Sequence, residues 1–150
     1  MTREEMMNEL GLAGEKVIIN LLSEEGRKIQ SSINKYDSEK DLMADGKKVE
    51  VKTQVPFVMQ NAFTFKPNQL RKCRSVDELY FVSVPHPTWN HFSDGWIYRA
   101  VPSEMKYHPW KDRWGKERII IPIKQDSLIP VCQMPSEKSK ELQSLLSTMY

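Results

Sequence analysis

The pair Asp45-Gly46 constrains the fold of this chain more than any other feature, because it separates two runs of strand-forming residues. Asp-Gly is a strong signal for a two-residue hairpin loop, since both central positions of that turn need a positive φ, which Asp tolerates and Gly adopts freely. The residues that would then face each other are Ala44 and Lys47, Leu42 and Val49, and Asp41 and Glu50. The sequence therefore predicts an antiparallel hairpin over residues 41–52.

Side chains alternate between the two faces of a strand, so this hairpin has two different faces. One face is apolar and suits packing against a helix; it carries Leu42, Ala44, Val49 and Val51. The opposite face carries Asp41, Glu50 and Lys52. We therefore expect one face to belong to the core and the other to carry polar chemistry.

The carboxylates of Asp41 and Glu50 would repel each other across the hairpin. At ~5 Å and an effective dielectric constant of ~20, the repulsion is on the order of 3 kcal/mol. Lys52 offsets only part of this repulsion, whereas Mg²⁺ relieves more of it, because Mg²⁺ binds one or two carboxylates together with waters and a substrate phosphate. The alternative is a solvated hairpin whose three charged side chains form surface ion pairs, and these residues alone leave both readings open.

Asp41, followed by Glu50-Val51-Lys52 on the next strand, resembles the motif of the PD-(D/E)XK phosphodiesterase superfamily. This superfamily includes type II restriction enzymes and archaeal-type Holliday-junction resolvases. The segments Asp-Leu-Met-Ala before the turn and Glu-Val-Lys-Thr-Gln after it are similar to those two groups, although Lys40 stands where the superfamily's name has proline. The resemblance covers about residues 3 to 84.

The order of the expected elements agrees with this resemblance. Apolar residues at three- and four-residue spacing predict an amphipathic helix from Thr2 to Ser23, with a capping box of Thr2 and Glu5 and a stop at Gly26. A weak strand over residues 27–33, the hairpin, a short helix over 67–73 and a buried strand over 78–84 follow. The resemblance implies an α/β, restriction-endonuclease-like αβββαβ core with a mixed central sheet flanked by helices.

The resemblance also implies a reaction, the hydrolysis of phosphodiester bonds in DNA by an endonuclease. Asp41, Glu50 and the backbone carbonyl of Val51 would hold Mg²⁺, or Mn²⁺ in its place, and Lys52 would orient the attacking water or stabilise the pentacovalent phosphorus. An RNA endonuclease would use the same residues. A nucleic-acid-binding or assembly protein that has the fold but does not cleave is the alternative from another functional class.

Two further residues are candidates for the catalytic site. Glu15, next to Gly14, lies where many superfamily members carry a glutamate on the first helix. It could equally be one more exposed helix carboxylate beside its neighbours Glu4, Glu5 and Glu9. Gln54 lies two residues beyond Lys52 on the same strand face, where it could reach substrate or water.

Net charge is only +2, with 22 basic and 20 acidic residues, so any nucleic-acid surface must come from local clustering. Residues 66–74 contain no acid, and on a short helix beside the hairpin they favour contact with phosphates over an ordinary solvated face. The candidates there are Lys66, Gln69, Arg71, Lys72 and Arg74. In a second window, residues 106–118, basic residues alternate with Tyr107, Trp110 and Trp114. These aromatic residues suit stacking on unpaired bases, or they lock an irregular loop onto the sheet.

Beyond residue 84 the sequence predicts a β-rich C-terminal elaboration and a terminal helix from Ser136. Strands are expected over 96–101 and 118–123, either extending the main sheet or forming a small second one, and prolines such as Pro109 are expected to break regular structure. We expect one nuclease-like domain over residues 1–150, with its core at about 3–84 and the elaboration at about 85–150.

The remaining expectations concern the environment of the chain. Cys73 and Cys132 have no metal-site spacing and are expected to be reduced thiols. No apolar run reaches ~18 residues and no signal-peptide pattern opens the chain, so we expect a cytoplasmic protein without membrane partners. A homodimer is expected, because two-fold symmetry suits cutting both strands of a duplex.

Overall fold

The computed structural model describes residues 2–32, 41–57, 61–89 and 93–147, and the side chains of Ser32 and Asp41 lie outside the described part. Its elements are, in chain order, α1 (Arg3–Glu24), β1 (Ile29–Ser32), β2 (Asp41–Ala44), β3 (Lys47–Gln54), β4 (Ala62–Phe65), α2 (Pro67–Arg74), β5 (Glu78–Ser83), β6 (Trp96–Ala100), the 3₁₀ turn η1 (Pro102–Glu104), β7 (His108–Lys111), β8 (Glu117–Pro122), β9 (Leu128–Gln133) and α3 (Ser136–Leu146).

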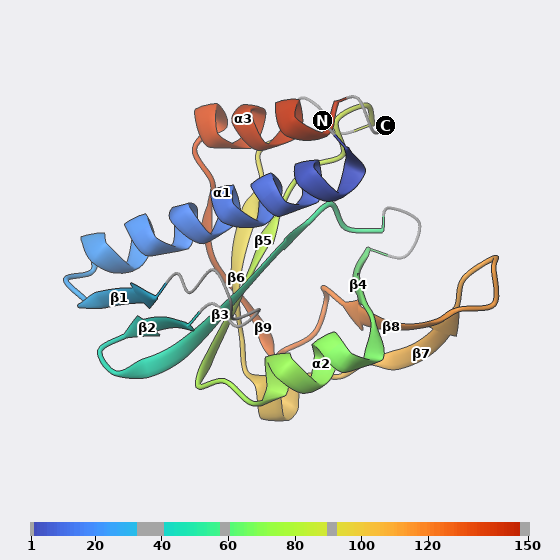
Figure 1. Ribbon diagram of the computed structural model, residues 1–150, viewed down its shortest axis with the longest axis horizontal. Helices are drawn as coiled ribbons and strands as arrows, with labels where there is room; N and C mark the ends of the chain where they lie inside the picture. The colour runs from blue at the N-terminus through green and yellow to red at the C-terminus, as the bar shows by residue number, and fades with distance from the viewer. Residues whose placement is uncertain (1, 33–40, 58–60, 90–92, 148–150) are drawn as a thin grey trace.

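The fold is α/β, with a mixed six-stranded sheet in the order β1-β2-β3-β5-β6-β9. The central pair β3 and β5 is parallel, and the other neighbours in this sheet are antiparallel. Helices α1 and α3 lie side by side over one face, whereas α2 and a three-stranded sheet, β4-β8-β7, lie on the other (Figure 1). The mixed central sheet flanked by helices agrees with the sequence-based expectation. None of the described helices combines the length and apolar character that crossing a membrane requires.

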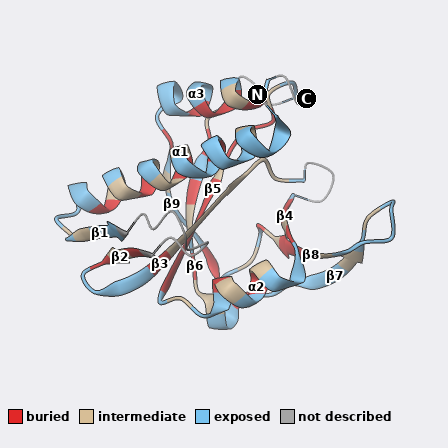
Figure 2. Cartoon of the chain, in the orientation of Figure 1, coloured by how far each residue is buried: buried red, intermediate tan, exposed pale blue. Residues whose placement is uncertain are grey.

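The hairpin of β2 and β3 has the predicted turn. Asp45 and Gly46 have φ values of 52° and 78°, and Leu42 faces Val49 as expected. The apolar face is buried against α1 in one cluster with Leu10, Ile18 and Leu22 (Figure 2). The pairs Leu42–Val49 and Ala44–Lys47 and the core face of the hairpin were therefore predicted correctly, whereas the recorded register ends at Val49 and does not include the predicted pair of Asp41 and Glu50.

An ion-pair network centred on the buried residue Glu78 holds the tip of this hairpin. Arg27, which follows α1, donates to both carboxylate oxygens of Glu78 at 2.8 and 2.6 Å, to Asp45 at 3.0 Å and to the carbonyl of Ala44 at 3.1 Å. Arg99 of β6 lies 3.3 Å from the same Glu78 carboxylate. The network ties the turn, the end of α1 and strand β5 together.

The predicted order αβββαβ is wrong in one respect, because β4 stands between β3 and α2. Strand β4 does not join the main sheet but pairs with β8, far along the chain, so no local pattern revealed its partner. The ring of Phe63 in β4 stacks on Phe81 of β5 with centroids 4.5 Å apart. The small sheet and the main sheet therefore share one apolar cluster.

The C-terminal region both extends the main sheet and completes the small one. Strands β6 and β9 lengthen the main sheet, and β7 and β8 join β4. The expectation that Pro109 breaks regular structure is wrong, since it lies within β7, as Pro130 lies within β9. Both strands are at sheet edges, where proline costs no ladder hydrogen bond on its open side.

Candidate active site

Strand β3 extends past its partner β2 and leaves part of one edge open. Its register with β2 ends at Val49, whereas its register with β5 continues to Gln54. Among the described strands, none pairs with this edge of β3 beyond Val49. The backbone groups of Val51 and Thr53 that point away from β5 are therefore not paired with a described strand at this edge.

Glu50 and Lys52 form an ion pair at this open edge. Lys52 Nζ lies 3.1 Å from Glu50 Oε1, and both side chains are half-buried. They lie on the face covered by α2, close to Cys73, whose pKa burial raises to about 11 while Lys52, Glu50 and Lys72 exert smaller electrostatic effects on it. The structure thus brings together the two charged residues that the sequence placed on one strand face.

The carbonyl of Val51 points toward the open edge. Asp77 and Val84 donate their N–H groups to the carbonyls of Lys48 and Gln54, so the even-numbered carbonyls of β3 point to the β5 side. Successive backbone groups of a strand alternate in direction. The Val51 carbonyl therefore points away from β5, toward the open edge of β3.

Glu15 of α1 reaches the same place from the opposite face of the sheet. A cavity of about 320 Å³ wraps the open edge, and its polar lining includes Glu15, Glu50, Lys52 and Lys72. Helix α1 approaches β3 closely because Gly14 lies over Thr53, where a Cβ would be 1.7 Å from Thr53 Oγ1. The residue next to this close contact is Glu15, so the packing of α1 sets its position.

The side chain of Asp41 lies outside the described residues, although its backbone begins β2 opposite Ser32. Among the described side chains, no three of His, Cys, Asp and Glu cluster closely enough to hold a metal ion by themselves. The described residues of this cavity that can offer oxygen atoms include Glu15 and Glu50 through their carboxylates and Val51 through its carbonyl. All are oxygen ligands, which is the donor type that Mg²⁺ and Mn²⁺ take, so the chemistry of this set fits a hard divalent cation.

Gln54 is engaged with the small sheet. Its side-chain amide donates to the carbonyl of Thr64 at 3.1 Å and accepts from the N–H of Thr64 at 2.8 Å. The Gln54 amide thus bonds both backbone groups of Thr64, as a neighbouring strand would do. These two bonds hold β4 beside β3. The structure therefore gives Gln54 a positioning contact, in addition to its place along the cavity that follows Lys52.

The five candidates of α2 divide between two sides of the helix. Lys66, Gln69 and Lys72 line the cavities along β3, and Gln69 Oε1 also accepts from the N–H of Lys66 at 2.9 Å. Arg74 instead donates to the carbonyl of Met105 at 3.3 Å and lies over the Tyr107 ring at 4.5 Å. Arg71 is exposed beside neither of these groups. Of these three, Lys72 lies in one cavity with Glu50 and Lys52, Gln69 shares a cavity with Lys52, and Lys66 lines the more distant one.

Sequence reasoning did not name Asn8 and Leu12, which line the cavity around Glu15. Their signal is present in the sequence, because positions 8, 12 and 15 lie on one helix face. Leu12 is 43% exposed, which is unusual for leucine on a helix that otherwise packs well. Exposed Leu12 and the acidic residue Glu15 thus lie on the same face of α1, the face that borders the cavity.

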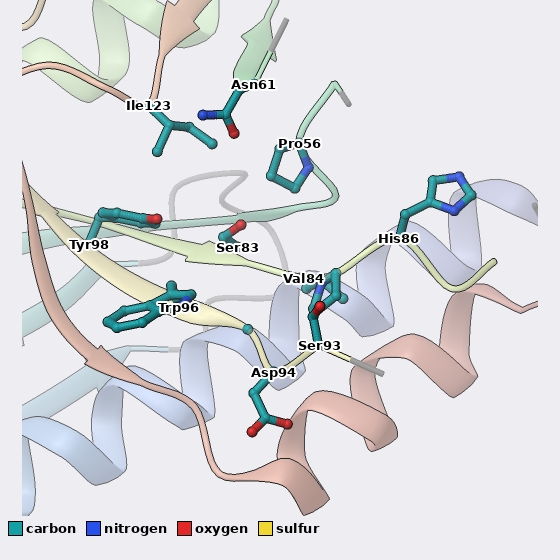
Figure 3. Close-up of a pocket in the computed structure, with 12 residues that line it drawn as sticks. Pro56, Asn61, Ser83, Val84, His86, Ser93, Asp94, Trp96, Tyr98 and Ile123 are labelled. Atoms are coloured by element: carbon teal, nitrogen blue, oxygen red, sulfur yellow. The ribbon is translucent and has the colours of Figure 1, made fainter. Parts of the chain in front are cut away.

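A second cavity, of about 420 Å³, lies between the ends of β5 and β6 and the small sheet. Tyr98, Ser83 and Asn61 surround it, whereas the Asp94 side chain points away (Figure 3) and accepts from Ser136 at 3.0 Å. His86 is buried and accepts hydrogen bonds from the N–H groups of Thr88 and Trp89. The described residues that line this second cavity include no ion pair directed into it. The open edge of β3 is therefore the stronger candidate for an active site.

Comparisons with family models, curated proteins and solved structures found no match to this chain.

Proposed function

We propose that this chain is a Mg²⁺-dependent endonuclease that hydrolyses phosphodiester bonds in DNA and has a restriction-endonuclease-like core. The observation that carries the proposal is the Glu50–Lys52 ion pair at the open edge of β3, in one cavity with Glu15. The motif Asp41, Glu50-Val51-Lys52, read from the sequence, agrees with this position at the end of the hairpin.

Glu50, Glu15 and the Val51 carbonyl are the described groups that would hold the cation, with Asp41 from the adjacent strand as a further ligand. When bound, Mg²⁺ supplies a Lewis acid that acidifies a water and neutralises charge on a phosphate. Two carboxylates in one half-buried cavity repel each other, and a divalent cation offsets that repulsion. Mn²⁺ takes the same oxygen ligands and would replace Mg²⁺.

Lys52 contributes a compact positive charge beside these carboxylates. Its ammonium group can hold the attacking water by a hydrogen bond or stabilise negative charge on the pentacovalent phosphorus. The contact with Glu50 at 3.1 Å fixes the ammonium group before substrate arrives, which is the preorganisation that electrostatic catalysis needs. Lys72 on α2 lines the same cavity and is placed to contact a phosphate beside the one being cleaved.

The test is cleavage by the purified chain of supercoiled, linear, single-stranded and branched DNA and of RNA, each with Mg²⁺, Mn²⁺ or EDTA. We expect metal-dependent nicking of DNA, and a loss of about 10²- to 10³-fold in rate for Lys52→Ala, the size found when one charge-stabilising group is removed. Lys48→Ala is the matched control, because Lys48 is on the same strand and the same face but is exposed near the turn.

The outcomes separate the possible functions. Tight binding of nucleic acid without cleavage under any metal would indicate a nucleic-acid-binding or assembly protein instead of an enzyme. Cleavage of RNA alone would indicate an RNA endonuclease. A Lys52→Ala protein that cuts as fast as the Lys48→Ala protein would refute the assignment of the site.

A further inference from the structure

We propose that the β7–β8 arm, residues 108–122, extends the candidate active site into a groove that binds an unpaired nucleic-acid strand. This inference rests on the proposed nuclease function, since it identifies the part of the substrate that lies beyond the cleaved bond.

Three adjoining cavities form one path away from the ion pair. The cavity with Glu50 shares Lys52 with the next cavity, which follows β3 to Gln54 and Thr64. That cavity shares Thr64 and Gln69 with a third, of about 880 Å³, which reaches the arm. In Figure 1 the tip of the arm projects beyond the amino-terminal end of α2. A strand held at the ion pair thus has a continuous route to the arm.

Aromatic rings line the far end of this path. Trp110 contacts Phe57, with ring centroids 5.6 Å apart, and both residues line the third cavity. Trp114 is 72% exposed, and the guanidinium group of Arg113 lies 4.5 Å from its ring centre. An exposed indole offers a flat aromatic face, and base stacking on aromatic rings is a common way in which proteins hold single strands.

The turn that carries Trp114 is held by its own hydrogen bonds. Asp112 accepts from the N–H groups of Trp114 and Lys116, each at 2.9 Å, and Gly115 has a φ of 77° that this turn requires. Arg118 pairs with the same carboxylate at 3.4 Å. The exposed ring is therefore presented by an ordered turn, which lowers the entropic cost of binding a partner.

The charges of the groove suit a polyanion. The described residues that line the third cavity include four basic side chains, Arg3, Lys66, Arg113 and Arg118, and one acidic side chain, Asp112, which is paired with Arg118. Positive charge attracts phosphates whatever the sequence. The rings then favour an unpaired strand, because a duplex offers base faces only at its ends.

The test is binding of fluorescein-labelled oligo(dT), oligo(rU) and a blunt DNA duplex, measured by anisotropy in EDTA so that nothing is cleaved. We expect Trp114→Ala to weaken binding of the single strands about tenfold, the effect of losing one stacked base. Duplex binding should change much less. Trp89→Ala is the matched control, because Trp89 is 67% exposed but stacks on His86 outside the groove. The tighter of the two single strands identifies the preferred sugar.

A charge variant gives a second, independent readout. Arg113→Ala should reduce the slope of log affinity against log salt by about one for single strands, because one phosphate contact is lost. Lys140→Ala, at an exposed position of α3 away from the groove, should leave this slope unchanged. Both readouts use the full chain, and thermal unfolding of each variant shows that it is folded.

The result that overturns the inference is a Trp114→Ala protein that binds oligo(dT) and oligo(rU) as tightly as the Trp89→Ala protein. An equal loss for the duplex and the single strands would also overturn it, since stacking on unpaired bases would then not be the cause. The nuclease proposal is tested separately, because its failure would be seen as an absence of cleavage. The binding measurements in EDTA do not require cleavage. An arm that binds single strands in a chain that does not cut would leave this groove in place and remove only the chemistry.

Discussion

Two acidic residues on the adjacent strands β3 and β5 pair with basic residues in opposite ways. Glu78 is 4% exposed, and its carboxylate contacts Arg27 and Arg99. Glu50 is 14% exposed, and in the described part of the chain it pairs with Lys52 alone, beside a cavity. We call the contacts of Glu78 with Arg27 and Arg99 the closed pair, and the contact of Glu50 with Lys52 the open pair. Both carboxylate oxygens of the closed pair are bonded within the protein, whereas the carboxylate of the open pair keeps lone pairs for a ligand. Exposure and the number of partners therefore distinguish a pair that stabilises the fold from one that is available for chemistry.

The electrostatics of the closed pair agree with this distinction. Hydrogen bonds from Arg27 hold the pKa of Glu78 below its ordinary value, and they outweigh the desolvation that would raise it. The pKa of Arg27 is raised in turn, chiefly by the same hydrogen bonds. Both shifts favour the charged forms of the two partners.

The largest effect on stability should come from opening the closed pair. Glu78→Ala leaves the Arg27 guanidinium group partly buried without its main partner, and breaking a buried pair in this way costs about 3–5 kcal/mol. Urea unfolding monitored by circular dichroism measures the change. Glu50→Ala is the control, with an expected cost of about 1 kcal/mol, because Lys52 borders a cavity where water can replace the lost carboxylate. Equal losses in the two variants would show that the open pair is structural too.

The packing of α1 on β3 gives the next effect. Gly14→Ala places a methyl group where Thr53 lies, and such overpacking costs about 1–3 kcal/mol. Gly11→Ala is the control, because it meets nothing within 4 Å and should stabilise the helix by about 0.5–1 kcal/mol. Thermal unfolding of both variants provides the comparison. A Gly14→Ala protein as stable as the Gly11→Ala protein would mean that α1 does not need this close approach, and Glu15 would not be held by it.

The smallest effect should be a dependence of stability on pH. Because the pKa of Glu78 is lowered by folding, its contribution is complete above the ordinary value of 4.5 and is lost as pH falls below it. Glu78→Gln removes this group, so the stability difference between wild type and Glu78→Gln should shrink between pH 5 and pH 3. Denaturant midpoints at several pH values measure it. A difference that stays constant over this range would contradict the assignment of the lowered pKa to the Arg27 contact.

The sequence predicted the parts of the fold that local chemistry determines. Asp45-Gly46 set the hairpin register, Thr2 and Glu5 form the capping box of α1, and Pro67 opens α2. Strands β4, β7 and β9 were not predicted, because each is short or contains proline and finds its partner far along the chain or at a sheet edge. Such pairings depend on the assembled sheets.

The same limit applies to the candidate site. Glu50 and Lys52 could be placed on one face from strand alternation alone, and the structure has them 3.1 Å apart. The engagement of Gln54 with Thr64 could not be foreseen without β4. The path from the ion pair to Trp114 likewise requires β8 to pair with β4, so sequence reasoning left the aromatic window open between a binding surface and a structural loop.

The most direct test of the central claim is the binding of Mn²⁺ by isothermal titration calorimetry in the absence of nucleic acid. We predict that the wild-type chain binds Mn²⁺ and that Glu50→Gln and Glu15→Gln each weaken this binding at least tenfold. Glu9→Gln, on the exposed side of the same helix, should bind as the wild type does. Equal Mn²⁺ affinity in the wild-type and Glu50→Gln proteins would contradict the account, because the open pair would then not be a metal site.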